Sequence, residues 1–142
     1  MEKRAVLFVD DEVKVLKSIA RCLLDESYQK YYAKSGQEAL EILRREEVHV
    51  IVVDMVMPGM DGLELLKIVK RQYPNIINMV LSGYAQPVKI MMAMYEVGIY
   101  RYISKPWTYD DDFRALIRRA IYDYNRQYER DDILVGLGSY SE

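Results

Sequence analysis

The chain is poor in the residues that build disulfides and histidine-based metal sites. Among its 142 residues are one cysteine, Cys22, and one histidine, His49. A lone cysteine cannot form an internal disulfide, which fits a reducing compartment, and Cys22 is more simply a small core residue than a nucleophile. One histidine leaves no room for a histidine-rich metal centre. The sequence therefore argues against a disulfide framework and against such a metal site.

Long apolar runs and a strong charge of one sign are also missing. No segment has the length of a membrane span, and no signal-peptide pattern precedes the first short apolar segment, so we expect a cytoplasmic protein without a membrane partner. The formal net charge is −2, which argues against direct nucleic acid binding through general electrostatics. With 51% hydrophobic and 30% charged residues, the chain has the composition of a globular domain with a real core.

Short apolar segments alternate with segments of helical periodicity along the chain. This alternation predicts an α/β fold, a doubly wound five-stranded parallel sheet with helices on both faces. The expected strands cover residues 4–9, 29–33, 50–53, 77–81 and 100–104. The expected helices cover residues 13–25 and 86–96, the intervals that follow Ser35 and Asp61, and a segment after Thr108 whose apolar stripe continues to Tyr128.

Local patterns refine this arrangement. Ser35 with Glu38, and Asp61 with Glu64, have the spacing of capping boxes at helix starts. The strand over 29–33 is short and more polar than the others, which predicts an edge position. The methionines of the helix over 86–96 are more often core filler than a partner surface. The helix over 13–25 is predicted to turn Leu16, Ile19, Ala20, Leu23 and Leu24 inward.

The stretch from His49 to Gly62, HVIVVDMVMPGMDG, organises the chain. Its β-branched run predicts a strand covered on both faces, and the run ends at Asp54. The apolar run 5–9 likewise ends in acids, Asp10 and Asp11. Parallel strands would bring these carboxylates to one edge, where a hard cation such as Mg²⁺ relieves their repulsion. The alternative is that one acid caps a helix while the others are solvated.

Two further polar residues follow expected strands at the same edge. Ser82 follows the fourth strand and Lys105 follows the fifth. Carboxylates, a hydroxyl and an ammonium in one cleft suit a phosphoryl group. Asp54 would then attack phosphorus as a nucleophile and form an aspartyl phosphate.

Four motifs in order carry a resemblance to a known family. They are FVDDE at 8–12, VDMVMPGMDG at 53–62, LSGYA at 81–85 and ISKPW at 103–107. Over about residues 4 to 121 the chain resembles the receiver domain of two-component response regulators, the CheY-like superfamily. The resemblance implies a flavodoxin-like fold with strand order 2-1-3-4-5.

The family's functional positions fall on residues of the right type in this chain. By resemblance, Asp54 is the phosphoacceptor, Lys105 binds the phosphoryl group, and Ser82 with Tyr102 forms the switch. The resemblance implies one cofactor, Mg²⁺, and no organic cofactor. Its ligands would be Asp10, Asp11, Asp54 and the backbone carbonyl of Val56.

The resemblance also implies partners and a domain plan. A sensor histidine kinase or a phosphotransfer protein would supply the phosphoryl group. We expect a receiver domain over 1–128, and over 129–142 a tail or the start of a linker to an absent effector domain. We also expect a homodimer through the face made by the helix over 86–96, the strand over 100–104 and the fifth helix. Such a domain is not an enzyme, although it assists its own phosphorylation and slow dephosphorylation.

Three alternatives compete with this interpretation. A phosphatase with an aspartate nucleophile typically carries a second acid two residues later, where this chain has Val56. A nucleotide- or flavin-binding domain on the same fold would carry a glycine-rich loop after the first strand, where this chain has acids. A receiver-like domain that has lost phosphorylation is disfavoured by the complete set of site residues.

Overall fold

Five strands alternate with five helices in the computed structural model, which describes residues 3–83, 87–104 and 111–140. In chain order they are β1 (Ala5–Val9), α1 (Val13–Cys22), β2 (Gln29–Ala33), α2 (Gly36–Arg45), β3 (Val50–Asp54), α3 (Gly62–Gln72), β4 (Ile77–Ser82), α4 (Pro87–Glu96), β5 (Arg101–Ser104) and α5 (Asp111–Tyr140).

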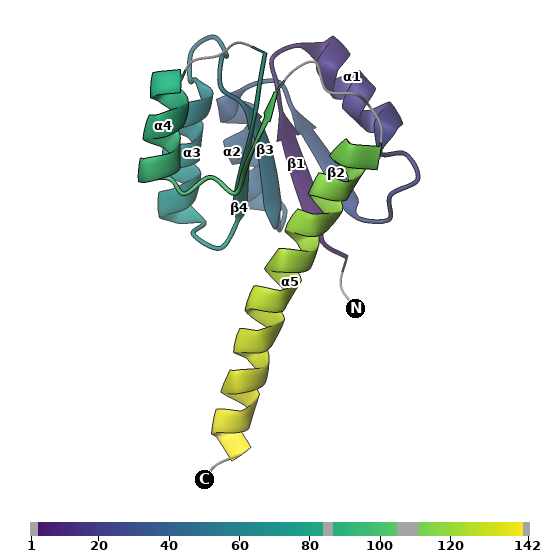
Figure 1. Ribbon diagram of the computed structural model, residues 1–142, viewed down its shortest axis with the longest axis vertical. Helices are drawn as coiled ribbons and strands as arrows, with labels where there is room; N and C mark the ends of the chain where they lie inside the picture. Colours follow the sequence, from purple (N-terminus) through teal and green to yellow (C-terminus); the bar gives the residue numbers. More distant parts are fainter. Residues whose placement is uncertain (1–2, 84–86, 105–110, 141–142) are drawn as a thin grey trace.

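The strands form one parallel sheet of order β2-β1-β3-β4-β5 (Figure 1). Helices α2, α3 and α4 cover one face of the sheet, and α1 and α5 cover the other (Figure 1). This arrangement confirms the predicted fold class and the strand order that the resemblance implied. It also places β2 at an edge, as its polar composition predicted.

Strands β1 and β3, which are neighbours inside the sheet, are buried along their whole length, which explains their apolar sequences. Along β3, Ile51 and Val53 belong to the core under α2, α3 and α4, whereas Val50 and Val52 belong to the core under α1 and α5. Alternate side chains of a strand point to opposite faces, so a strand between two helical layers needs apolar residues at every position.

Side-chain caps fix the starts of two helices. The Ser35 hydroxyl accepts a hydrogen bond from the Glu38 backbone N–H at 3.1 Å, at the start of α2. The Asp61 carboxylate accepts one from the Glu64 backbone N–H at 2.9 Å, at the start of α3. Each cap satisfies a helix N–H that has no partner within the helix. Both predicted capping boxes therefore begin helices at the expected places.

Helix α1 is shorter than its sequence pattern predicts, because it ends at Cys22 instead of Asp25. The prediction that Leu24 points inward is wrong, since 74% of it is exposed. Leu24 lies in the turn after the helix, where helical spacing no longer decides which face a side chain occupies. Cys22 itself is half-buried and packs against the core under α1 and α5.

The methionines of α4 lie on the surface, so their prediction as core filler is wrong. Met91, Met92 and Met94 are exposed by 57%, 41% and 56%. The smaller Ala93 and Val97 are the residues of this region that enter the core. Helical spacing places 93 and 97 on one face, and the three methionines lie off that face, toward solvent.

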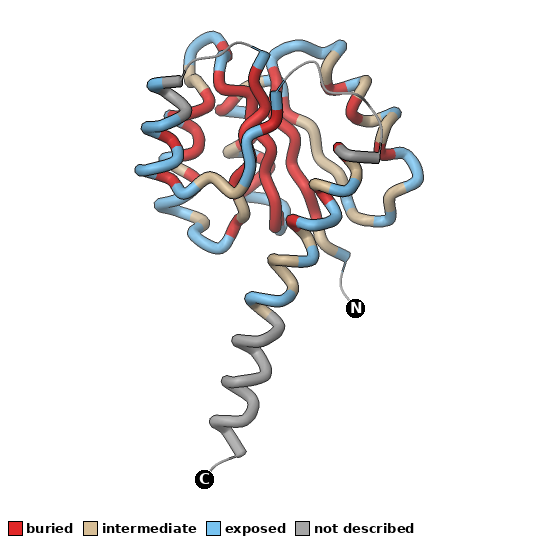
Figure 2. Tube along the Cα trace, in the orientation of Figure 1, coloured by how far each residue is buried: buried red, intermediate tan, exposed pale blue. Residues whose placement is uncertain are grey.

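Helix α5 is the longest element, with 30 residues. Phe113, Ile117 and Ala120 pack on the sheet, and the helix then extends away from the body of the molecule (Figures 1 and 2). It runs through residue 128 without a break, so the division into a receiver domain and a linker stays a prediction. Within the described ranges, no helix combines the length and the apolar character that a membrane span requires.

Candidate functional site

Three aspartates meet at the carboxyl edge of the sheet. Strand β1 lies beside β3 in parallel, so the residue after β1, Asp10, comes close to the last residue of β3, Asp54. One carboxylate oxygen from each of Asp10, Asp11 and Asp54 lies within 4.8 Å of the others. Asp10 and Asp54 are buried, and Asp11 is exposed. We call these three residues the acidic edge.

Backbone hydrogen bonds hold Asp10 in place. Its N–H donates to the Ala33 carbonyl of β2 at 3.1 Å, and its carboxylate accepts from the Glu12 N–H at 2.9 Å. Helix α1 starts after Glu12, whose side chain makes no capping hydrogen bond. The alternative in which one acid caps this helix while the others are solvated is therefore wrong for Asp10, which is buried and turns into the site.

The loop after β3 folds back over Asp54. The Val56 N–H donates to the Asp54 carboxylate at a long 3.4 Å, and the Gly62 N–H donates to the Met55 carbonyl at 3.1 Å. A Cβ atom on Gly62 would lie 2.4 Å from the Asp54 carbonyl oxygen and 2.7 Å from the Met55 Cα. Only glycine permits this approach. The sequence analysis named Gly62 only as the end of the organising stretch and missed its role as a support of the site.

The chemistry of this donor set suits Mg²⁺. Carboxylate oxygens are hard ligands, and like charges so close together repel one another unless a cation or a proton intervenes. The sequence predicted this grouping of Asp10, Asp11 and Asp54, and the structure brings all three together. Receiver-type acidic pockets generally bind Mg²⁺, and the residues present here fit that ion.

Three of the remaining predicted site residues lie on β4, on β5 and in the loop after β3. Ser82 is buried at the end of β4, one residue beyond Leu81, the register partner of Asp54. Tyr102 pairs with Val80 and is 39% exposed. Val56 is half-exposed beside Asp54. Lys105 lies outside the described residues, so its predicted role stays a prediction; the same holds for the motif positions 84–85 and 106–107.

A parallel sheet of order 2-1-3-4-5 defines a class of fold, the flavodoxin-like doubly wound domains, and this one carries aspartates at its carboxyl edge. The family model for the response regulator receiver domain matches residues 6–118. The chain belongs to this family, which comprises the receiver domains of two-component response regulators and is regulatory.

Named relatives agree with this assignment. The chain is 40% identical over 120 residues to the hydrogenase transcriptional regulatory protein HoxA of Cupriavidus necator, covering 84% of this chain and 24% of HoxA. It is 32% identical over 142 residues to the DNA-binding transcriptional regulator NtrC of Proteus hauseri, covering 100% of this chain and 30% of NtrC. The chain thus spans less than a third of the length of these relatives.

A solved structure has the same fold. The signal receiver domain of an HD domain-containing protein from Pseudomonas fluorescens Pf-5 superposes with a TM-score of 0.84 at 29% identity. The match covers 88% of this chain and 99% of that one. The fold and the acidic edge therefore lie within the part of the chain that related proteins share.

Proposed function

We propose that this chain accepts a phosphoryl group on Asp54 from a phosphohistidine of a sensor histidine kinase or a phosphotransfer protein. The observation that carries the proposal is the meeting of three aspartates, two of them buried, at the carboxyl edge of a receiver-family sheet. Asp54 is the acid that lies within a strand, because it is the last residue of the fully buried β3, at the carboxyl edge of the sheet.

In the proposed transfer, a carboxylate oxygen of Asp54 attacks phosphorus. An O–P bond forms while the N–P bond of the phosphohistidine breaks. The imidazole nitrogen keeps the electron pair of that bond and takes up a proton. The attack uses the Asp54 side chain in its carboxylate form, because a carboxylate oxygen supplies the electron pair of the new O–P bond.

Asp10, Asp11, Asp54 and the Val56 carbonyl would hold Mg²⁺, which when bound neutralises charge on the phosphoryl oxygens. Lys105 would pair with a phosphoryl oxygen, and Ser82 would donate a hydrogen bond to another. Val56 stands where an aspartate-nucleophile phosphatase carries its second acid, so we expect slow loss of the phosphoryl group and no enzymatic turnover.

Phosphoryl transfer can be tested with a small donor. We expect phosphoramidate with Mg²⁺ to add one phosphoryl group to the chain, detected by intact-mass spectrometry. Asp54→Ala should abolish the labelling, whereas Asp25→Ala, in the turn after α1, should leave it unchanged. Labelling of Asp54→Ala to the same extent as the parent would refute the assignment of Asp54.

The proposed output is a change in the face made by α4, β5 and α5. Phosphorylation would draw the Ser82 hydroxyl toward Asp54 and let Tyr102, now 39% exposed, turn inward. Met91 and Tyr95 contribute exposed apolar surface to this face, which suits an interface. Relatives three to four times longer than the matched region support an effector region that the face and α5 would control.

We expect this face to form a homodimer that phosphorylation strengthens. Beryllofluoride with Mg²⁺, a mimic of the phosphoryl group, should raise the average mass measured by light scattering at micromolar protein. Tyr95→Glu, which puts a charge where an 87% exposed aromatic stands, should suppress the increase. If the mimic is shown to bind and the average mass stays unchanged, phosphorylation of Asp54 does not control dimer formation.

A further inference from the structure

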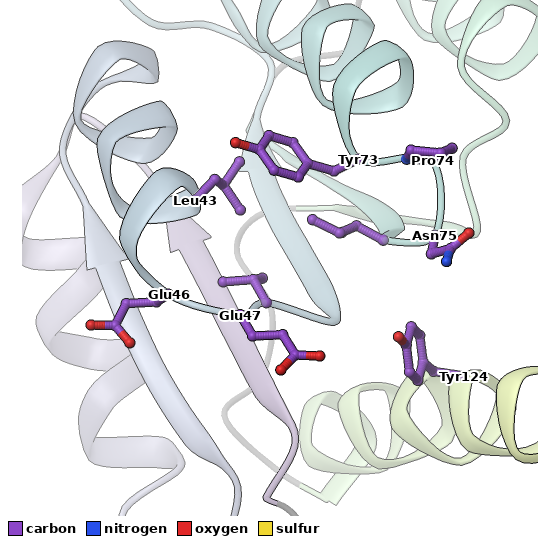
Figure 3. A pocket seen from close by; sticks show the side chains of 9 residues that line it. Leu43, Glu46, Glu47, Tyr73, Pro74, Asn75 and Tyr124 are labelled. Atoms are coloured by element: carbon purple, nitrogen blue, oxygen red, sulfur yellow. The ribbon is translucent and has the colours of Figure 1, made fainter.

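A cleft of about 310 Å³ lies at the amino edge of the sheet, opposite the acidic edge (Figure 3). Three separate parts of the chain form it: the end of α2 with the following residues, the α3–β4 connection, and α5. In Figure 3, Glu46, Glu47, Tyr73, Asn75 and Tyr124 surround the opening. Among the described residues of the proposed phosphorylation site, none contributes to this cleft.

The cleft combines an apolar floor with acidic and aromatic walls. Leu43, Val48 and Ile76 supply buried apolar surface, and Glu46 and Glu47 are exposed carboxylates. None of the described residues that line it carries a positive charge. Such a lining suits an amphipathic cation, whose apolar stem contacts the floor while its charged head meets the carboxylates.

A second cleft, of about 300 Å³, continues from the first and shares Pro74, Asn75 and Ile76 with it. It follows α5 past Asp123 and Tyr128, and its lining includes one cation, Lys70. We call the two clefts together the rim groove. Its described lining contains three carboxylates and one ammonium, so the groove is negative overall.

The Asn78 side chain leaves the second cleft with a hydrogen-bond acceptor that has no donor. The residue is 4% exposed, it lines the cleft, and its side-chain oxygen has no hydrogen-bond partner. A buried acceptor without a donor costs free energy, so a ligand that brings an N–H group into the cleft gains from pairing with it. The unsatisfied group and the carboxylates of the groove are all acceptors, whereas a guanidinium has donors only.

The chain already holds one guanidinium beside the groove. The Cζ atom of Arg4 lies 5.1 Å from the centre of the Tyr124 ring, and the Arg4 Nε–H donates to the Asn125 side-chain oxygen at 2.6 Å. The buried His49 ring meets Tyr124 edge-on, with 5.0 Å between ring centres. These contacts hold the Tyr124 side chain in position at the side of the cleft. They also show an arginine that stacks on a tyrosine and donates to an amide oxygen, which is how a partner's arginine could bind here.

We propose that the rim groove docks a basic polypeptide segment of a partner protein through its arginine side chains. One arginine would place its stem on Leu43 and Ile76 and its guanidinium at the Glu46 and Glu47 carboxylates. N–H groups further along the segment would reach the Asn78 side-chain oxygen. An extended segment fits better than a small cation because two clefts with a shared wall form one continuous path along α5.

Binding can be measured by NMR titration of the ¹⁵N-labelled full chain. The probe is a blocked hexapeptide with two arginines among alanines, and its control replaces both arginines with citrulline, the uncharged isostere. We expect the arginine peptide to bind about fivefold more tightly, since each of two exposed ion pairs adds modestly. Its shifts should centre on Asn75, Asn78 and Tyr124.

Matched variants locate the binding surface. Glu46→Gln with Glu47→Gln removes both charges but keeps acceptor oxygens, including the one that receives the Tyr31 hydroxyl at 3.1 Å. This double variant should lose the preference for arginine over citrulline. Glu41→Gln, at an exposed position of α2 that pairs with Arg44 at 3.7 Å, should retain it. Preserved parent spectra outside the groove would verify that both variants fold.

Several results would overturn the proposal. These are equal affinity for the two peptides, shifts centred outside the rim groove, or an unchanged preference in the Glu46→Gln, Glu47→Gln variant. The same shifts on raising protein concentration without peptide would identify a second copy as the occupant and also overturn it. Phosphorylation plays no part in the measurement, so its outcome is independent of the function proposed for Asp54.

Discussion

The two ends of the same parallel sheet handle charge differently. The carboxyl edge gathers three aspartates whose oxygens lie within 4.8 Å of one another. The amino edge combines unlike groups: Arg4 with Asn125, and His49 with Glu47 at 3.4 Å. Like charges raise the free energy of the folded chain until a ligand offsets them, whereas a hydrogen-bond donor that faces an acceptor lowers it. The contrast indicates that the acidic edge needs a ligand to offset its repulsion, whereas Arg4, Asn125, His49 and Glu47 form a fixed junction beside the rim groove.

The largest effect should come from the glycine that supports the acidic edge. Gly62→Ala would press its Cβ against backbone atoms of Asp54 and Met55, at 2.4 Å and 2.7 Å. Backbone yields less readily than a side chain, so we expect a loss of about 1–3 kcal/mol in the free energy of unfolding. Weaker Mg²⁺ binding should accompany it, because Asp54 must move. Urea unfolding and Mg²⁺ titration measure the two effects.

Gly36→Ala is the matched control at the start of α2. A Cβ there would meet the Met60 sulfur at 2.6 Å, a flexible side chain that can rotate away. Alanine also favours a helix over glycine by about 1 kcal/mol, which offsets part of the cost. Equal losses from the two variants would contradict the special role of Gly62.

A smaller effect is expected from relieving the repulsion directly. Asp54→Asn should stabilise the metal-free protein, and Mg²⁺ at ten times its dissociation constant should stabilise the parent by about 1.4 kcal/mol. The variant should gain less from the ion. Thermal unfolding with Mg²⁺ and with a chelator tests both effects, and Glu47→Gln at the amino edge should respond to the ion as the parent does. A larger response to Mg²⁺ in Asp54→Asn would be the opposite of this expectation.

The smallest effect should appear at His49. Its Nδ1 accepts from the Ala5 N–H at 3.0 Å, so the neutral ring carries its proton on Nε2, facing Glu47. Burial, and then the charge of Arg4, lowers the pKa of His49 below its usual 6.5. The unfolded chain therefore takes up the proton first as pH falls. The contribution of His49 to the free energy of unfolding should be fully present above about pH 6.5. It should decline below that pH, until the pKa of His49 in the folded chain is reached.

Urea unfolding between about pH 7.5 and pH 5.5 measures this decline. His49→Phe keeps an aromatic ring but cannot titrate, so its free energy of unfolding should change less across the same window. The slopes are compared, because the variant also loses the hydrogen bond from Ala5. An identical decline in His49→Phe would assign the pH dependence to other groups.

Sequence reasoning predicted the parts that local rules decide. The unbroken apolar run of 50–53 required a strand between two helical layers, and the capping boxes at Ser35 and Asp61 fixed two helix starts. Asp10 and Asp54 could be placed together because parallel strands end at one edge. These inferences depend on period, turn chemistry and topology, all of which are readable along the chain.

Other features were decided by contacts that no local pattern records. Arg4 and Asn125 are 121 positions apart, so their hydrogen bond and the amino-edge junction could not be foreseen. The methionines of α4 have core-like side chains but lie outside because Ala93 and Val97 fill the contact. The close approach of Gly62 to the Asp54 backbone leaves no signal in the sequence and is visible only in the structure.

The length of α5 has a mechanical consequence. The helix has 30 residues, its first turns are seated on the sheet through Phe113 and Ile117, and Tyr124 is held by Arg4 and His49. The portion beyond Tyr124 is a lever about 24 Å long. A tilt of the helix by about 10° at Tyr124 would move its far end by about 4 Å. Any change of helix angle at this junction would therefore be magnified into a displacement of the far end.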